Sequence, residues 1–112
     1  MRKAALISLA LGACITQATL APAQTKGDAA ALFGSKCAVC HGAKGDASTE
    51  IGRNMKLRDL RSPDVQKSTD EQLMTIVRCG KGKMPGYEKR LTGDQIAVLV
   101  EYMRTLAGGK QR

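Results

Sequence analysis

Hydrophobic residues recur at helical spacing in three stretches of the chain, and the pattern predicts no sheet. The stretches cover residues 28–37, 68–80 and 92–109, and each places its apolar side chains on one face of a helix. These faces comprise Ala30, Phe33 and Cys37, then Leu73, Ile76 and Val77, and finally Ile96, Leu99, Val100 and Met103. We therefore predict an all-α fold with one helix in each stretch.

Capping signals refine the predicted helices. Asp28 is placed to cap the first helix, and Ser62-Pro63 is typical of a short helix with proline at its first position. Capping-box patterns open the other two helices, at Ser68-Thr69-Asp70-Glu71 and at Thr92-Gly93-Asp94-Gln95. The polar segments 42–61 and 81–89 are predicted loops. We expect three to four short helices joined by long functional loops.

The first 23 residues predict a secretory signal peptide. They begin with the basic segment Met1-Arg2-Lys3, continue through an apolar stretch and end in Ala21-Pro22-Ala23, a cleavage site of the A-x-A type. The apolar stretch is too short to span a membrane, and no later segment is apolar enough to do so. We expect removal of residues 1–23, leaving residues 24–112 as one exported, periplasmic domain.

The segment Cys37-Ala38-Val39-Cys40-His41 carries the clearest chemistry. Near-helical backbone places the two thiols about one turn apart on one face, where each sulfur can bond to one haem vinyl group. His41 is the only histidine among the 112 residues, so no other imidazole can serve as the proximal iron ligand. The pattern is the haem-attachment signature of c-type cytochromes, and it predicts one haem c bonded to Cys37 and Cys40.

Two other kinds of site also use a Cys-x-x-Cys pair. A thioredoxin-type redox pair lies at a strand-to-helix turn, and no convincing strand precedes Cys37. A zinc site needs four ligands, and Cys79 with one carboxylate would have to complete it without zinc-ligand spacing. Neither alternative explains His41, so the haem interpretation is favoured over both.

Four methionines follow residue 23, and a methionine thioether is the usual second axial ligand in cytochromes c. Met74 and Met103 lie on predicted helices, where core packing is expected, and Met55 lies in a polar loop. Met84 lies in the segment 81–87, whose glycines permit a close backbone approach and whose proline stiffens the loop. We favour Met84 as the distal iron ligand.

These residues resemble the class I c-type cytochromes in their small bacterial monohaem form. The matching positions are Cys37, Cys40 and His41 for the attachment motif, Gly42 for the glycine after it, Met84-Pro85 for the distal ligand and its proline, Phe33 for the aromatic of the first helix, and Leu99 with Tyr102 for the pair that crosses it. The resemblance covers residues 28–107 and implies a small cytochrome c fold wrapped around one covalently attached haem.

The chain departs from that family in two places. Many members carry a proline segment whose carbonyl accepts the ring N–H of the proximal histidine, and no proline lies between His41 and Pro63. The tryptophan that contacts a haem propionate in mitochondrial relatives is also missing. Four basic residues of the same loop are candidates to neutralise the propionates: Arg53, Lys56, Arg58 and Arg61. The alternative is that they simply form a solvated basic loop.

Charge and ligation together predict a function. The formal charge is +8, or +6 without residues 1–23, and the charges are spread without the interleaved aromatics that bind nucleic acid. With both axial positions filled, substrate cannot reach the iron, so no enzymatic activity is expected. We predict a monomeric carrier of single electrons that docks transiently on acidic redox proteins through a basic rim of Lys36, Lys81, Lys83 and Lys89. The alternatives are a haem-bearing subunit of a larger exported oxidoreductase complex and a ligand-binding haem protein.

Two cysteines lie outside the attachment motif. Cys14 ends Leu11-Gly12-Ala13-Cys14, which resembles a lipoprotein signal, so a lipid anchor at Cys14 is the alternative to cleavage after Ala23. Cys79 lies at the end of the middle helix, where we favour a packing role over an intermolecular bridge.

Overall fold

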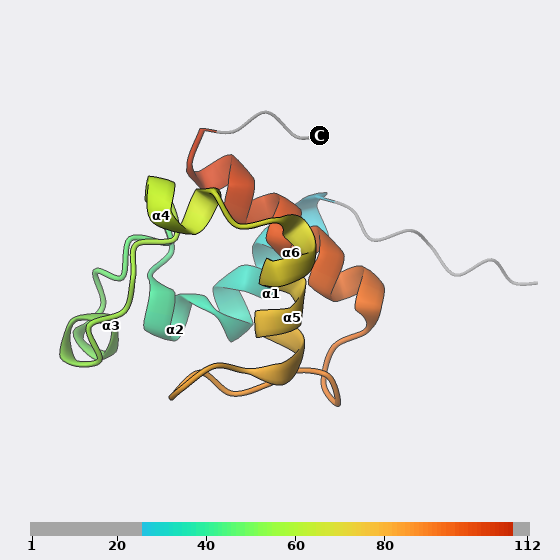
Figure 1. Cartoon of the computed structure of the whole chain (residues 1–112), viewed down its shortest axis with the longest axis horizontal. Coiled ribbons are helices and arrows are strands. Elements are labelled where there is room, and N and C mark those ends of the chain that lie inside the picture. Colours follow the sequence, from blue (N-terminus) through green and yellow to red (C-terminus); the bar gives the residue numbers. More distant parts are fainter. Residues whose placement is uncertain (1–25, 109–112) are drawn as a thin grey trace, which may run out of the picture.

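The computed structural model describes residues 26–108 of the chain, and Figure 1 shows their arrangement. The predicted signal peptide, its cleavage site and Cys14 lie outside the described residues. Within residues 26–108 the fold is all-α, as predicted, and no sheet is present. Its helices are α1 (Lys26–Lys36), α2 (Ala38–His41), α3 (Glu50–Asn54), α4 (Pro63–Gln66), α5 (Asp70–Cys79) and α6 (Gly93–Leu106).

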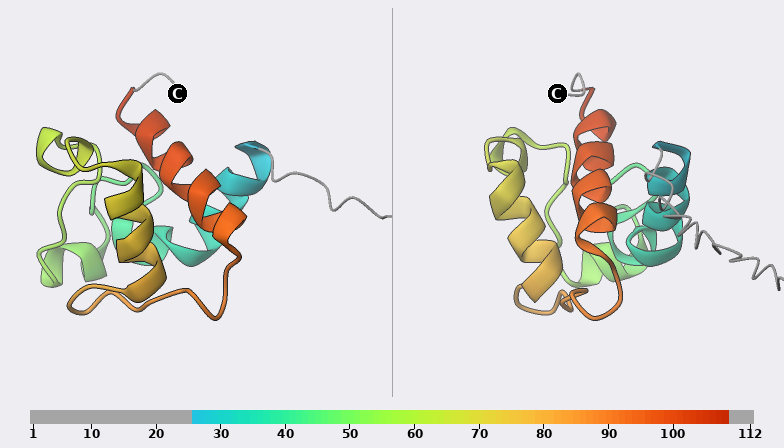
Figure 2. Two further views of the ribbon diagram at one scale, coloured as in Figure 1. Left: turned by 45° about the vertical axis from the view of Figure 1, so that its right-hand side comes forward. Right: turned by 90° about the vertical axis from the view of Figure 1, so that its right-hand side faces the viewer.

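The C-terminal helix α6 organises the core, because it packs against both α1 and α5 (Figure 2). Phe33 of α1 and Tyr102 of α6 meet with ring centroids 5.3 Å apart and planes tilted by 54°, a favourable aromatic geometry. Phe33 also shares a buried cluster with Leu99, so the predicted crossing of the first and last helices is confirmed. A second cluster joins α4, α5 and α6 through Val65, Leu73, Val100 and Met103.

Most predicted helix starts are observed. The Ser62 side chain caps α4 with Pro63 in its first turn, and Thr92 and Gln95 form the capping box of α6. The capping box of α5 lies one residue later than predicted, between Thr69 and Gln72. The Ser68 backbone carbonyl, just before this cap, accepts a hydrogen bond from Arg104.

The first helix and the first loop differ from the prediction. Helix α1 includes Lys26, so Asp28 lies within the first turn rather than before it, and its negative charge interacts favourably with the helix dipole there. The segment 42–61, predicted as a loop, contains α3, whose N-terminus is capped by the side chain of Thr49. Short helices of this kind bury little apolar surface, so they leave no hydrophobic periodicity in the sequence.

Cys79 does not take the packing role that the sequence favoured. It is the last residue of α5, and it is exposed to solvent. Of the apolar stripe of α5, Leu73 is buried, and Cys79 lies off that stripe. Among residues 26–108, no helix is both long enough and apolar enough to cross a membrane.

Arg104 of α6 holds the connection between α4 and α5 in place. Its guanidinium donates hydrogen bonds to the backbone oxygens of Gln66 (2.8 Å) and Ser68 (2.7 Å), and it pairs with Asp70 at 2.6 Å. Its side chain is only 20% exposed, in contrast to the Arg58–Asp64 pair, whose side chains are 70% and 61% exposed. The Arg104 interactions should therefore be worth much more than an ordinary surface ion pair.

Replacement of Arg104 by alanine should lower the free energy of unfolding by about 2–4 kcal/mol, because it leaves partly buried carbonyls without donors. Arg58→Ala, the matched control, should cost less than about 0.5 kcal/mol. Urea unfolding of the haem-loaded protein measures both values. Equal losses in the two variants would contradict the structural role of Arg104.

Candidate functional site

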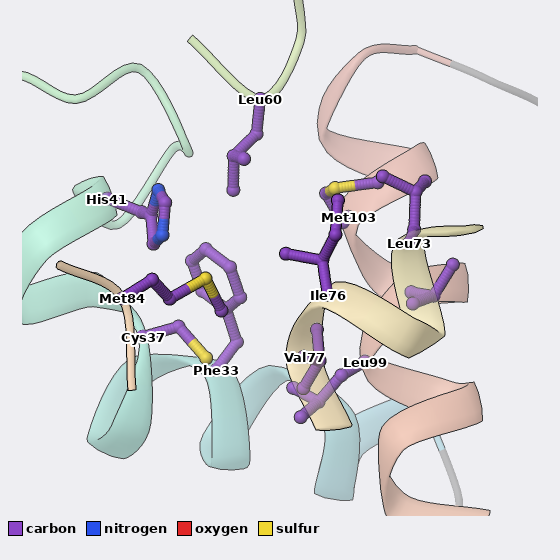
Figure 3. Close-up of a pocket in the computed structure, with 11 residues that line it drawn as sticks. Phe33, Cys37, His41, Leu60, Leu73, Ile76, Val77, Met84, Leu99 and Met103 are labelled. Atoms are coloured by element: carbon purple, nitrogen blue, oxygen red, sulfur yellow. The ribbon is translucent and has the colours of Figure 1, made fainter. Parts of the chain in front are cut away.

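An apolar cavity lies between the α1–α2 segment and the pair α5–α6 (Figure 3). It encloses about 520 Å³ of space, including its opening to solvent. Every side chain in its wall is apolar or sulfur-bearing except His41. Figure 3 shows His41 and Met84 pointing into the cavity opposite Ile76, Val77 and Met103. We call this space the inner cavity; its other lining residues are Phe33, Cys37, Leu60, Leu73, Leu99 and Val100.

The attachment motif forms one edge of the inner cavity. Cys37 precedes the short helix α2, and its carbonyl oxygen accepts hydrogen bonds from the amides of Cys40 (3.2 Å) and His41 (2.9 Å). This single turn brings both sulfurs and the imidazole to the same region. An adjoining outer pocket is lined by all three of these residues and by Met84, together with Lys36, Val39, Met55, Leu57, Lys83, Pro85 and Tyr87.

Burial tunes the protonation of this motif. It raises the pKa of Cys37 to about 11, with a smaller contribution from neighbouring Cys40. A thiol that stays protonated is a poor nucleophile, so the thioredoxin-type alternative loses support. Burial lowers the pKa of His41, which favours the neutral imidazole that can bind a metal. Within residues 26–108 no group of three histidine, cysteine or acidic residues lies close enough to hold a metal ion, so the zinc alternative lacks ligands.

The loop after the motif is pinned to the motif backbone. The amide of Ala47 donates to the His41 carbonyl at 2.8 Å, and the Thr49 hydroxyl donates to the Cys40 carbonyl at 2.8 Å. The same Thr49 oxygen accepts the amide of Gly52 at 2.9 Å. A Cβ atom at Gly52 would lie 2.6 Å from the Cys40 oxygen, so only glycine allows this close approach. The loop therefore fixes the end of α2 and with it the position of His41.

The structure distinguishes the four candidate methionines. Met84 alone among them lines both the inner cavity and the outer pocket. Met103 also reaches the inner cavity, but it is buried in the α4–α5–α6 cluster, and Met74 is partly buried between the two clusters and lines neither pocket. Met55 is 40% exposed and lines only the outer pocket. The packing roles predicted for Met74 and Met103 agree with these positions.

The residues of the inner cavity fit a haem group. Its walls are apolar and Cys37 lies at its edge. It offers one imidazole, from His41, and two thioethers, from Met84 and Met103, of which only Met84 also lines the outer pocket. The Nδ1 atom of His41 is buried and has no hydrogen-bond partner in the described part of the chain, so the structure shows no carbonyl that accepts the ring N–H of His41. Haem bound there supplies an iron that gains and loses one electron, while the chain supplies the ligands and excludes water.

The basic residues proposed for the propionates lie elsewhere. Arg61 pairs with Asp59 at 2.8 Å and Arg58 lies 3.7 Å from Asp64, while Arg53 donates to the Ser48 carbonyl. Neither these three nor Lys56 lines the inner cavity or the outer pocket, so the structure does not support a propionate role for them. Leu57 lines the outer pocket and Leu60 the inner cavity, and neither was predicted, since a single leucine in a polar loop carries no periodic signal.

Comparisons with known proteins agree with this geometry. Residues 24–103 match the family described as cytochrome C oxidase, cbb3-type, subunit III. The FixP subunit of a cbb3-type cytochrome c oxidase from Azorhizobium caulinodans is 35% identical over 89 residues, which cover 80% of this chain and 29% of FixP. The chain thus spans less than a third of that relative. Cytochrome c6 from Leptolyngbya boryana is 35% identical over 79 residues, covering 68% of this chain and 89% of the relative.

Solved structures show the same fold. The KustC0563 c-type cytochrome superposes with a TM-score of 0.62 at 25% identity, covering 73% of this chain and 96% of that one. Cytochrome c6 from the diatom Phaeodactylum tricornutum superposes with a TM-score of 0.57 at 25% identity, covering 76% and 97% of the two chains. The chain therefore belongs to the c-type cytochrome family that these models and relatives define, as a small class I electron-transfer cytochrome with covalently bound haem c.

Proposed function

We propose that the protein carries single electrons between exported redox proteins through a haem bonded to Cys37 and Cys40, with His41 and Met84 as axial ligands. The observation that carries this proposal is that all four residues line the outer pocket, although Met84 lies more than forty positions from the motif in the chain. Cys37, His41 and Met84 also line the adjoining apolar inner cavity. Two filled axial positions leave no site for substrate at the iron, which favours a carrier over an enzyme.

The surface beside the outer pocket supports docking of a redox partner there. Val39 is 60% exposed and Met55 is 40% exposed, and they are two of the three exposed large apolar side chains in residues 26–108. Both line the outer pocket together with exposed Pro85 and with two exposed basic residues, Lys36 and Lys83. An apolar centre with basic flanks fits a partner that presents an acidic rim, because charge steers the encounter and apolar contact brings the redox centres close. We call the docking surface the five residues Lys36, Val39, Met55, Lys83 and Pro85.

The charge of the docking surface can be tested with small oxidants of opposite sign. Oxidation of the reduced protein by ferricyanide, an anion, should slow as ionic strength rises, whereas oxidation by a cationic cobalt(III) phenanthroline complex should accelerate. Lys83→Glu should lower the ferricyanide rate by about threefold or more at low salt, because a two-unit charge change near the reacting edge weakens steering. Stopped-flow absorbance measures each rate.

Lys67→Glu is the matched control, because Lys67 is exposed, pairs with Asp64 at 2.5 Å and lines neither pocket. It makes the same change in net charge at a different place. If Lys67→Glu and Lys83→Glu changed the rates equally, net charge alone would steer the reaction and the docking surface would be wrongly placed.

A fixed subunit of a larger oxidoreductase is the second candidate function. It is favoured by the match to FixP, which is named as a subunit of a cbb3-type cytochrome c oxidase and is more than three times the length of the aligned segment. Against it stands the match to cytochrome c6, of which the aligned segment covers 89%. Gel filtration of native extract distinguishes a free small haem protein from a haem protein that elutes with a complex.

We also propose export after removal of residues 1–23, with a lipid anchor at Cys14 as the alternative. The family match begins at residue 24, so in either form the matched domain lies after the removed or anchoring segment. Intact-mass measurement of the native protein separates a chain that begins at Gln24 from one that carries an acylated Cys14.

A further inference from the structure

The Met84 segment forms a loop whose two ends touch through backbone atoms. At its start, a Cβ atom added to Gly80 would lie 2.6 Å from the Met84 carbonyl oxygen and 2.7 Å from the Gly86 nitrogen. At its end, a Cβ atom added to Gly86 would lie 2.8 Å from the carbonyl oxygens of both Arg78 and Cys79. No side chain fits at either place, so the two glycines let the chain cross itself at a neck.

Hydrogen bonds close the loop on both sides of this neck. Within the loop, Lys81 and Met84 exchange two backbone hydrogen bonds, of 3.1 and 3.0 Å. Beyond it, the amides of Tyr87 and Glu88 donate to the carbonyls of Val77 and Arg78 at 2.9 and 3.1 Å. The loop is therefore tied directly to the last turn of α5, which also supplies Ile76 and Val77 to the wall of the inner cavity.

Tyr87 links the same neck to the attachment motif. Its hydroxyl donates to the carbonyl of Lys36 at 3.2 Å, and Lys36 directly precedes Cys37. The ring of Tyr87 is partly buried against the core cluster that contains Phe33. One short segment thus fixes the place of Met84 relative to α5 on one side and to the cysteine motif on the other.

We propose that Gly80 and Gly86 are positioning residues, whose crossing holds the Met84 sulfur at the distal side of the haem and resists its exchange for other ligands. The inference rests on the proposed ligation by Met84. It follows that widening the neck by one methyl group would shift Met84 as a unit with its loop, while the covalently attached haem and the α1–α6 core stay in place. Distal lability, rather than loss of fold, is the expected consequence.

Gly86→Ala is the sharpest test, because Gly86 has no positive φ and the added methyl group acts by collision alone. In the haem-loaded ferric protein it should weaken or remove the far-red absorption band of iron–thioether ligation. It should also raise the affinity for added imidazole by about tenfold or more, the size of effect expected when one methyl group overpacks a tight site. Gly82→Ala is the control in the same loop. The φ of Gly82, +57°, makes alanine strained there, but the added Cβ atom would meet no neighbouring atom within 4 Å, so this variant strains the loop without widening the neck.

The outcomes separate the two proposals. A wild-type protein without the thioether band would refute Met84 ligation and the neck with it. A wild-type band that persists in Gly86→Ala, with imidazole affinity within about twofold of wild type, would overturn the neck alone, as would equal effects of Gly82→Ala and Gly86→Ala. Tyr87→Phe removes only the hydrogen bond from Tyr87 to the Lys36 carbonyl and adds no atoms, so it tests the proposal even if Gly86→Ala does not fold. It should raise the affinity of the haem iron for imidazole by about threefold. An unchanged affinity would count against the proposal.

Discussion

Replacement of both Cys37 and Cys40 by alanine should abolish covalent haem and leave a chain that does not reach its native fold. The two sulfurs are the proposed attachment points, and the inner cavity, which Cys37 borders, is walled by the same side chains that form the core. Without a haem to fill it, this small domain would enclose an apolar void, and voids in cores are strongly destabilising. Haem staining after denaturing electrophoresis and far-ultraviolet circular dichroism measure the two effects.

Cys79→Ala is the matched control for that experiment. Cys79 is exposed at the end of α5, so its loss should leave haem content unchanged and stability within about 0.5 kcal/mol of wild type. Haem that stayed covalently bound in the double variant would contradict the attachment sites.

Replacement of Met84 by alanine should convert the haem iron from a six-coordinate to an open form. The far-red thioether band of the ferric protein should disappear, the reduced protein should bind carbon monoxide, and the reduction potential should fall by on the order of 100 mV or more, since axial ligands set haem potentials over a wide range. Absorption spectra and a redox titration measure these changes.

Two other methionines provide controls for Met84→Ala. Met74→Ala should keep the thioether band and lower the unfolding free energy by about 2–4 kcal/mol, because Met74 packs against both core clusters. Met55→Ala should keep the band with little loss of stability, since Met55 is 40% exposed. A band that survived in Met84→Ala and vanished in Met55→Ala would make Met55, directly after α3, the distal ligand.

The sequence was a good guide to the long helices, because their information is periodic. The apolar stripe of α6 and its Thr92–Gln95 capping box predicted its core face and its start. The start of α5 was misjudged by one residue, since two adjacent hydroxyl residues, Ser68 and Thr69, each have an acidic or amide residue three positions later and can each serve as cap. Helix α3 escaped notice because its packing comes from backbone contacts at Gly52 rather than from an apolar stripe.

The candidate iron ligands in the cavity were predictable because their residue types and sequence contexts are rare in this chain. The lone histidine after a Cys-x-x-Cys pair and a methionine in a glycine-rich loop stand out in any sequence, and the structure brings them to one cavity. Lys56 and the three arginines near it were indistinguishable from residues that face a cofactor. The ion pairs of Arg58 with Asp64 and of Arg61 with Asp59 depend on loop geometry that the sequence does not show. The exposure of Cys79 likewise depends on the direction in which α5 turns its apolar face.

The central claim is that one haem is bonded to this chain and held between an imidazole nitrogen and a thioether sulfur. The most direct test is the absorption spectrum, oxidised and reduced, of the unmodified protein purified from a host that attaches haem c. We predict a coloured protein with one haem per chain, a low-spin spectrum and the far-red ferric band of thioether ligation. A colourless product, or a coloured one whose spectrum reports an open or bis-nitrogen iron, would contradict the account.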